Sequence, residues 1–170
     1  MTKFQTVKGD LLAVSHGVII HGCNDKGVMG SGVAAGVKNR FPGAFNIYRQ
    51  AFDAGELEIG TCTFHQERLN LWIVNAVTQT LGTPNPLSYV GLKECFNQTL
   101  AFMVALEQAR GIPYGTLPLL FPKIGAARGG GDWNMISAII EDALTAYETV
   151  FHKARPAVLY TIDTEPVDCR

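Results

Sequence analysis

The chain has 170 residues, of which 47% are hydrophobic and 17% charged, and its formal net charge is −1. That length can bury a sizeable core without disulfides or metals, and the composition excludes a disordered chain. No apolar run reaches the roughly 20 residues that a membrane span needs, and no basic run with interleaved aromatic residues indicates a broad nucleic-acid-binding face. We therefore expect one soluble domain over residues 1–170, and any nucleotide ligand to be small.

Strands and helices alternate along the predicted chain. Short apolar runs bounded by glycine or proline predict strands, and apolar stripes at helical spacing predict helices. In chain order we expect strands 4–7 and 17–21, helices 32–40 and 42–54, strands 60–65 and 70–77, helix 88–110, strand 116–121, helix 133–151 and strand 157–162. This alternation predicts a three-layer α/β/α fold, in which helices cover both faces of a mixed, partly parallel sheet. Such sheets bind ligands beyond the carboxyl ends of their strands.

Two glycine-rich loops follow apolar strands and lead into helices. They are 22–31, after GVIIH, and 122–132, after TLPLLF. Successive backbone N–H groups in such a loop converge on an anion, helped by the positive end of the following helix. A plain tight turn is the alternative for either loop taken alone. If both loops lie at one edge of the sheet, they enclose a group with two negative charges, such as a diphosphate.

The sequence does not match the dinucleotide-binding fingerprint or the phosphate-binding loop of nucleoside triphosphatases. Gly30, Gly32 and Gly36 form G-x-G-x-x-x-G, but the dinucleotide fingerprint follows its strand directly, whereas about eight residues intervene here. The next predicted element is a helix, although the dinucleotide fold requires a strand ending in an acidic residue. The sequence also lacks G-x-x-x-x-G-K-[ST], the phosphate-binding loop of many nucleoside triphosphatases.

Three separate motifs resemble the macrodomain family. They are GDLL from Gly9, GVIIHGCNDKGVMGSGVA from Gly17, and FPKIGAARGGGDW from Phe121. The second and third motifs are similar to the branch that processes ADP-ribose-1″-phosphate in phages, bacteria and yeast. The resemblance covers almost the whole chain, and it implies a macrodomain-like fold, a site for ADP-ribose and no cofactor.

The resemblance also assigns roles along the ligand. Asp10, beside the Leu11 backbone, would accept a hydrogen bond from the adenine amino group, although a turn residue or helix cap is the alternative. Asn24 would bind the distal ribose, because an amide offers a donor and an acceptor to a diol; an Asx turn is its alternative. The residues implied to wrap the diphosphate are Gly30, Ser31, Gly32 and Val33 on one side, and Gly125, Ala126, Ala127, Arg128 and Gly129 on the other.

Hydrolysis at the distal ribose requires a positioned water, an acid or base, and donors for the developing charge. The candidate catalytic residues are His21, Asn24 and Asp132. An imidazole titrates close to neutral pH, which suits His21 for proton transfer, but a hydrogen-bonded core histidine is the alternative. Asp132 directly precedes the helix from Trp133, and the spacing favours a helix cap over catalysis.

One position departs from relatives that remove ADP-ribose from proteins or DNA through a lysine after the fourth strand. The sequence there is AVTQT, with Gln79 at the position of the lysine. An amide cannot act as an amine nucleophile, which argues against that mechanism here. The side-chain amide of Gln79 could hold the ribose or a water instead, while an exposed loop glutamine is the default interpretation. We therefore predict an ADP-ribose-1″-phosphate phosphatase. A non-catalytic ADP-ribose reader and a hydrolase that removes ADP-ribose from macromolecules remain alternatives, so ADP-ribosylated macromolecules are further expected partners.

The remaining features concern compartment and cofactors. The N-terminal MTKFQTVKGD lacks the apolar core of a secretory signal, and the four cysteines form no C-x-x-C pair, so a cytoplasmic location is expected. The four histidines show no spacing typical of metal ligands, and no metal site is expected. Cys23 lies inside the first glycine-rich loop, where a buried spectator thiol is expected. A monomer is expected.

Overall fold

The computed structural model describes residues 2–127 and 129–162. Their elements, in chain order, are β1 (Gln5–Lys8), a short 3₁₀ helix η1 (Leu11–Ala13), β2 (Gly17–Asn24), α1 (Gly32–Arg40), α2 (Pro42–Asp53), β3 (Cys62–Arg68), β4 (Leu71–Gln79), α3 (Tyr89–Arg110), β5 (Leu119–Phe121), α4 (Trp133–Phe151) and β6 (Ala157–Thr161). The short η1 helix was not expected from the sequence.

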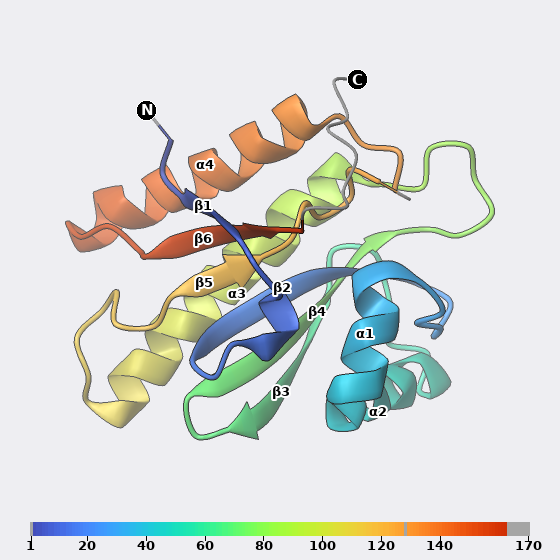
Figure 1. Cartoon of the computed structure of the whole chain (residues 1–170), viewed down its shortest axis with the longest axis horizontal. Coiled ribbons are helices and arrows are strands. Elements are labelled where there is room, and N and C mark those ends of the chain that lie inside the picture. Colours follow the sequence, from blue (N-terminus) through green and yellow to red (C-terminus); the bar gives the residue numbers. More distant parts are fainter. Residues whose placement is uncertain (1, 128, 163–170) are drawn as a thin grey trace.

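The strands form one six-stranded sheet in the order β1-β6-β5-β2-β4-β3 (Figure 1). All neighbouring strands are parallel except β3 and β4, which form an antiparallel pair. The mixed α/β fold predicted from the sequence is therefore confirmed. Because five strands run in the same direction, their carboxyl ends meet at one edge of the sheet.

Two apolar cores cover the two faces of the sheet. Along β2, Val18 and Ile20 pack with residues of α3 and α4, whereas Ile19 packs with residues of α1 and α2. All three side chains are fully buried. Burial on both faces explains why β2 is a continuous apolar run rather than an alternating one. The three layers can be followed in Figure 1.

The strands that carry the loops differ from the sequence-based bounds. β2 and β4 continue to Asn24 and Gln79, beyond the expected ends at 21 and 77, because the two strands stay paired through Cys23 opposite Val77. Pairing between strands thus overrides the weak strand propensity of the glycine-rich segment. β5 begins at 119 instead of 116, after Pro118, which has no N–H to donate to a ladder.

The longest helix, α3, has 22 residues. The Ser88 hydroxyl accepts a hydrogen bond from the Gly91 N–H at its start, and Gly111 ends it in the left-handed conformation with φ of 66°. Both ends use the residue types that such caps favour. None of the helices in the described ranges is both long and apolar enough to cross a membrane.

Candidate functional site at the carboxyl edge of the sheet

Both glycine-rich loops leave the same edge of the sheet. β2 and β5 are parallel neighbours, with Val18 opposite Leu119, and the loops follow the carboxyl ends of these two strands. Both loops lie at one edge of the sheet, which is the condition stated above for a diphosphate site shared by the two loops. The end of β1, which carries Asp10, and the end of β4, which carries Gln79, lie at this edge as well.

The first loop presents an open backbone to solvent. Gly30, Ser31 and Gly32 are exposed, and Val33 is half-buried. A Cβ added at Gly30 or Gly32 would meet no atom within 4 Å. Ser31 is the N-cap of α1 by position, but its side chain makes no capping hydrogen bond. The first-turn N–H groups of α1 therefore face the edge of the sheet without a side-chain cap, which is the arrangement in which a helix start binds anions.

Asn24 holds the first loop in shape. Its Oδ1 accepts hydrogen bonds from the Lys26 N–H at 2.9 Å and from the Tyr48 hydroxyl at 3.0 Å, and its Nδ2 donates to the Val28 carbonyl at 2.8 Å. The Asx turn considered for Asn24 is therefore present. One N–H of the amide remains for a ligand hydroxyl, so ribose binding by Asn24 stays a prediction.

Tyr48 is a residue of this site that the sequence analysis missed. It lies on α2 and is fully buried, and its hydroxyl also donates to the Asn24 carbonyl at 2.7 Å. Burial raises the pKa of Tyr48, so the phenol stays protonated as a donor. In the sequence it is one apolar position among others of an amphipathic helix, and no local signal links it to a loop some twenty residues earlier.

The second loop folds on itself and packs against the segment that follows β4. The Gly131 N–H donates to the Gly125 carbonyl at 2.9 Å, and the Leu87 N–H donates to the Gly129 carbonyl at 3.1 Å. A Cβ added at Gly129 would lie 2.6 Å from the Gly125 oxygen and 3.0 Å from Oε1 of Gln79. Glycine is therefore required at position 129 by the close approach of two backbone segments.

The other predicted members of the second loop differ in exposure. Ala126 is half-buried and Ala127 is exposed. Arg128 lies outside the described residues, so its predicted contact with the diphosphate stays a prediction. Lys123, which was not singled out in the sequence, has its ammonium 5.9 Å from the centre of the Trp133 ring.

Gln79 lies between the two loops. Its carbonyl accepts a hydrogen bond from the Asp25 N–H at 3.1 Å, and its side-chain oxygen approaches Gly129. The neighbouring Thr80 hydroxyl donates to Oδ2 of Asp25 at 3.1 Å. The end of β4 is thus tied to the loop after β2 and reaches the loop after β5. That position is compatible with an amide that holds a ribose or a water, which stays a prediction.

Asp10 occupies the edge beyond β1. Its Oδ1 accepts a hydrogen bond from the Leu12 N–H at 2.9 Å, which makes it the N-cap of η1, and its Oδ2 accepts one from Nη1 of Arg40 at 3.0 Å. The side chain is 58% exposed, so the carboxylate remains open to a further donor. Leu11 next to it is buried. The cap predicted as the alternative for Asp10 is present together with an accessible carboxylate.

His21 is placed as a core residue. It has no exposed surface, and its Nε2 donates to Oδ1 of Asn75 at 2.6 Å. The Asn75 amide in turn donates to the Ala44 carbonyl and the Thr63 hydroxyl, both at 2.9 Å. Burial lowers the pKa of His21 to about 4, against a smaller opposing effect of the Asn75 hydrogen bond. The ring is therefore neutral near pH 7 and has no exposed surface, as expected of the hydrogen-bonded core histidine considered as the alternative. The proton transfer considered for His21 stays a prediction.

Cys23 lies beside the His21 ring. It is buried, and burial raises its thiol pKa. A thiol held protonated in an apolar core is a poor nucleophile. These properties agree with the spectator role expected for Cys23.

Asp132 is the N-cap of α4. Its Oδ1 accepts a hydrogen bond from the Asn134 N–H at 2.9 Å, and its own N–H donates to the Tyr89 hydroxyl at 2.9 Å. The capping function favoured by the sequence is therefore present. One carboxylate oxygen of Asp132 is thus bound to the first turn of α4. The catalytic role considered for Asp132 stays a prediction.

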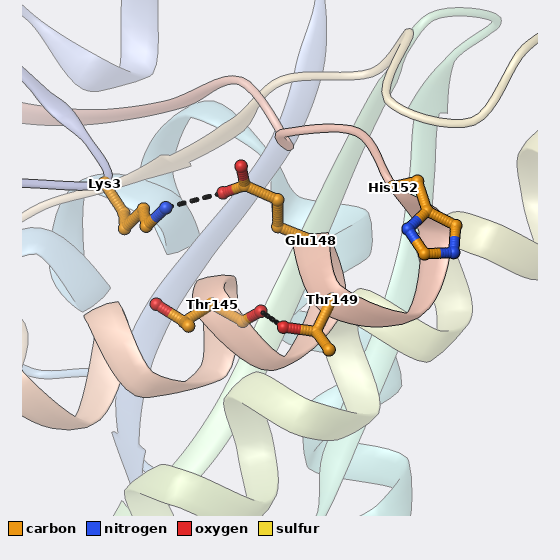
Figure 2. A pocket seen from close by; sticks show the side chains of 5 residues that line it. All are labelled: Lys3, Thr145, Glu148, Thr149 and His152. Carbon is orange, nitrogen blue, oxygen red and sulfur yellow. Dashed lines mark hydrogen bonds and ion pairs between the residues drawn. The ribbon is translucent and has the colours of Figure 1, made fainter.

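A separate hollow of about 410 Å³ lies near the C-terminal end of α4 (Figure 2). Within it, Nζ of Lys3 pairs with Glu148 at 2.7 Å, and the Thr149 hydroxyl donates to the Thr145 carbonyl at 3.0 Å. Since the second loop precedes the opposite end of α4, the hollow lies away from the carboxyl edge and is not part of the site. Among the described residues, no group of three or more His, Cys, Asp or Glu side chains could hold a metal ion.

Comparison with known families decides the classification. The model of the Macro domain matches residues 20–140, more than two thirds of the chain. The chain belongs to the macro domain family. The resemblance drawn from the three sequence motifs is thereby confirmed.

Individual relatives of this macro domain differ in activity. The chain is 30% identical to a DNA ADP-ribosyl glycohydrolase of Thermus aquaticus over 85% of its own length, but it spans only 38% of that relative. It is 46% identical to an ADP-ribose 1″-phosphate phosphatase of Aspergillus clavatus, over 28% of this chain and 24% of the phosphatase. Among solved structures, it resembles Thermosipho africanus DarTG in complex with ADP-ribose, with a TM-score of 0.68, 21% identity, and coverage of 98% of this chain and 43% of that one.

Proposed function

We propose that this macro domain binds ADP-ribose along the carboxyl edge of its sheet, with the diphosphate between the two glycine-rich loops. The order of the strands carries the proposal. Along the edge, β1 presents Asp10, β5 and β2 present the two loops, and β4 presents Gln79. This is the order of the parts of ADP-ribose, from adenine through the diphosphate to the distal ribose.

Backbone donors suit the charged centre of such a ligand. The exposed segment Gly30–Gly32 opens α1, whose start has no side-chain cap, and the loop after β5 adds backbone groups at the same edge. The start of α4 is different, because the Asp132 carboxylate already accepts from the Asn134 N–H there. Oriented backbone N–H groups and the positive end of α1 stabilise an anion without a lysine or arginine. The same donors would stabilise charge that develops on a phosphate oxygen during hydrolysis.

We further propose that the reaction is hydrolysis of the phosphate monoester of ADP-ribose-1″-phosphate. Two observations support this. Under the resemblance to the family, Gln79 stands where relatives that remove ADP-ribose from macromolecules have a lysine, and an amide can orient a water but cannot attack a carbon as an amine does. The stretch that is similar to the Aspergillus phosphatase also has the higher identity of the two relatives, although it is short.

A second candidate activity is removal of ADP-ribose from DNA. It is favoured by the relative from Thermus aquaticus, whose similarity extends over 85% of this chain. In the absence of an amine at position 79, this reaction would need a water activated by another group. A reader that binds ADP-ribose without turnover is the remaining outcome.

One set of assays separates these functions. Calorimetric titration with ADP-ribose tests binding, phosphate release from ADP-ribose-1″-phosphate tests the phosphatase, and release of ADP-ribose from ADP-ribosylated DNA tests the glycohydrolase. Asn24→Ala should weaken binding and abolish turnover, while Thr149→Ala, in the hollow at the far end of α4, should change neither. Absence of binding at millimolar ADP-ribose rejects the proposal, and binding without phosphate release rejects the phosphatase.

A further inference from the structure

Asp10 is held by a cation from a different element. Arg40, the last residue of α1, donates from Nη1 to Oδ2 of Asp10 at 3.0 Å, and the two side chains are 49% and 58% exposed. The other oxygen of Asp10 is held by the Leu12 N–H. The carboxylate is therefore fixed from two sides and still open to solvent at the edge of the sheet.

The contact belongs to a docking of η1 on α1. A Cβ added at Gly36 would lie 2.7 Å from Cδ1 of Leu12, one helical turn before Arg40. The same helix begins at the first glycine-rich loop. Helix α1 thus begins at the segment proposed to hold the diphosphate. At its other end, Arg40 binds Asp10, the side chain proposed to face adenine.

The chemistry of the pair is directional. An ionised carboxylate only accepts hydrogen bonds, so it suits the 6-amino group of adenine and repels a 6-oxo group. A guanidinium only donates, so at the same place it would suit a 6-oxo group instead. Nη1 of Arg40 is occupied by its hydrogen bond to Asp10. The group that faces the purine is therefore the carboxylate of Asp10 and not the guanidinium of Arg40.

We propose that Arg40 is a specificity-determining residue, whose ion pair with Asp10 makes the site select a 6-aminopurine over a 6-oxopurine. This inference rests on the proposed function, since it requires that adenine lies at Asp10. A basic residue in the last turn of a helix also stabilises the helix dipole. That role would change stability and leave base selection unaltered, so the two roles can be measured separately.

The test compares the affinities for ADP-ribose and inosine diphosphate ribose by calorimetry. The wild type should prefer ADP-ribose at least about tenfold, as a hydrogen bond to a charged group allows. Arg40→Ala should lower the affinity for ADP-ribose about three- to fivefold, the range of an exposed ion pair, and leave that for the inosine ligand unchanged. Arg40→Lys should restore part of the preference, and Asp10→Asn should reverse it, because its amide and the released Arg40 both donate.

Lys38→Ala is the matched control, because it removes a positive charge from the same helix at a side chain that stacks on Phe45 instead. The Lys38→Ala protein should prefer ADP-ribose over inosine diphosphate ribose as strongly as the wild type does. In about 1 M salt the preference of the wild type should fall toward that of Arg40→Ala, because screening weakens an exposed pair.

Four results would contradict the proposed role of Arg40 or the function on which it rests. An Arg40→Ala protein that keeps the wild-type preference overturns it, as does one that loses both ligands equally together with a lower melting temperature. A wild type that binds both ligands equally overturns it while the proposed binding of the diphosphate ribose stands. A wild type that binds neither ligand rejects the proposed function itself.

Discussion

The buried His21 of β2 allows a quantitative prediction of how the free energy of unfolding changes as the pH falls below 7. His21 has a folded-state pKa of about 4 against an ordinary value of 6.5. Between these values the unfolded chain binds the proton and the folded chain does not, so the free energy of unfolding falls as the pH falls through this window. The contribution of His21 is complete above pH 6.5. It should be lower by about 2 kcal/mol at pH 5 than at pH 7, and by about 3 kcal/mol at pH 4.

The assay is urea unfolding of the wild type and of His21→Gln at several pH values between 7 and 4. Glutamine can donate to Oδ1 of Asn75 but does not titrate, and carboxylates contribute equally to both proteins. The difference between the two unfolding free energies should therefore shrink by about 2 kcal/mol from pH 7 to pH 5. Parallel pH profiles would show that His21 is protonated as readily in the folded chain as in the unfolded one, and would refute its assignment as a neutral core residue.

Three further expectations concern single substitutions. Arg155 forms two hydrogen bonds to the buried Glu107, at 2.6 and 2.8 Å, so Arg155→Met should lower the free energy of unfolding by about 3–5 kcal/mol at pH 7 in urea titrations; a loss below about 1 kcal/mol would contradict an uncompensated buried carboxylate. Tyr48→Phe removes the hydroxyl that holds Asn24, and should cost about 1–2 kcal/mol of stability and weaken ADP-ribose binding; unaltered affinity in calorimetry would mean that the loop keeps its shape without this hydroxyl. Gly129→Ala places a Cβ 2.6 Å from a backbone oxygen of its own loop, so the loop must shift, and the affinity for ADP-ribose should fall about tenfold or more together with the melting temperature; wild-type affinity would remove that loop from the site.

Local signals predicted most of the elements. The bounds of α1 and α4 match the expectation, 32–40 and 133–151, because glycine opens one helix and Asp132 caps the other. The sequence left open whether the two loops share an edge of the sheet, and the parallel pairing of β2 with β5 shows that they do. Capping residues and apolar periodicity are properties of short segments, so they can be read from one sequence.

Contacts between distant segments could not be predicted. The Glu107–Arg155 pair joins residues 48 positions apart, and the hydrogen bond between His21 and Asn75 spans 54. Each depends on the order of the strands, which the sequence left open. Burial of the His21 ring favours the core histidine that the sequence analysis gave as the alternative to a catalytic one. A polar residue at the end of an apolar strand looks the same in sequence in both cases.

The central claim is that two loops from distant parts of the chain hold one diphosphate. Amide chemical shifts recorded by NMR during titration with ADP-ribose test it most directly. The account expects saturable shifts that concentrate in residues 30–33 and 125–129 with a common dissociation constant, and none around Glu148 in the hollow at the far end of α4. Shifts confined to one loop, or the absence of saturable shifts at millimolar ligand, would contradict it.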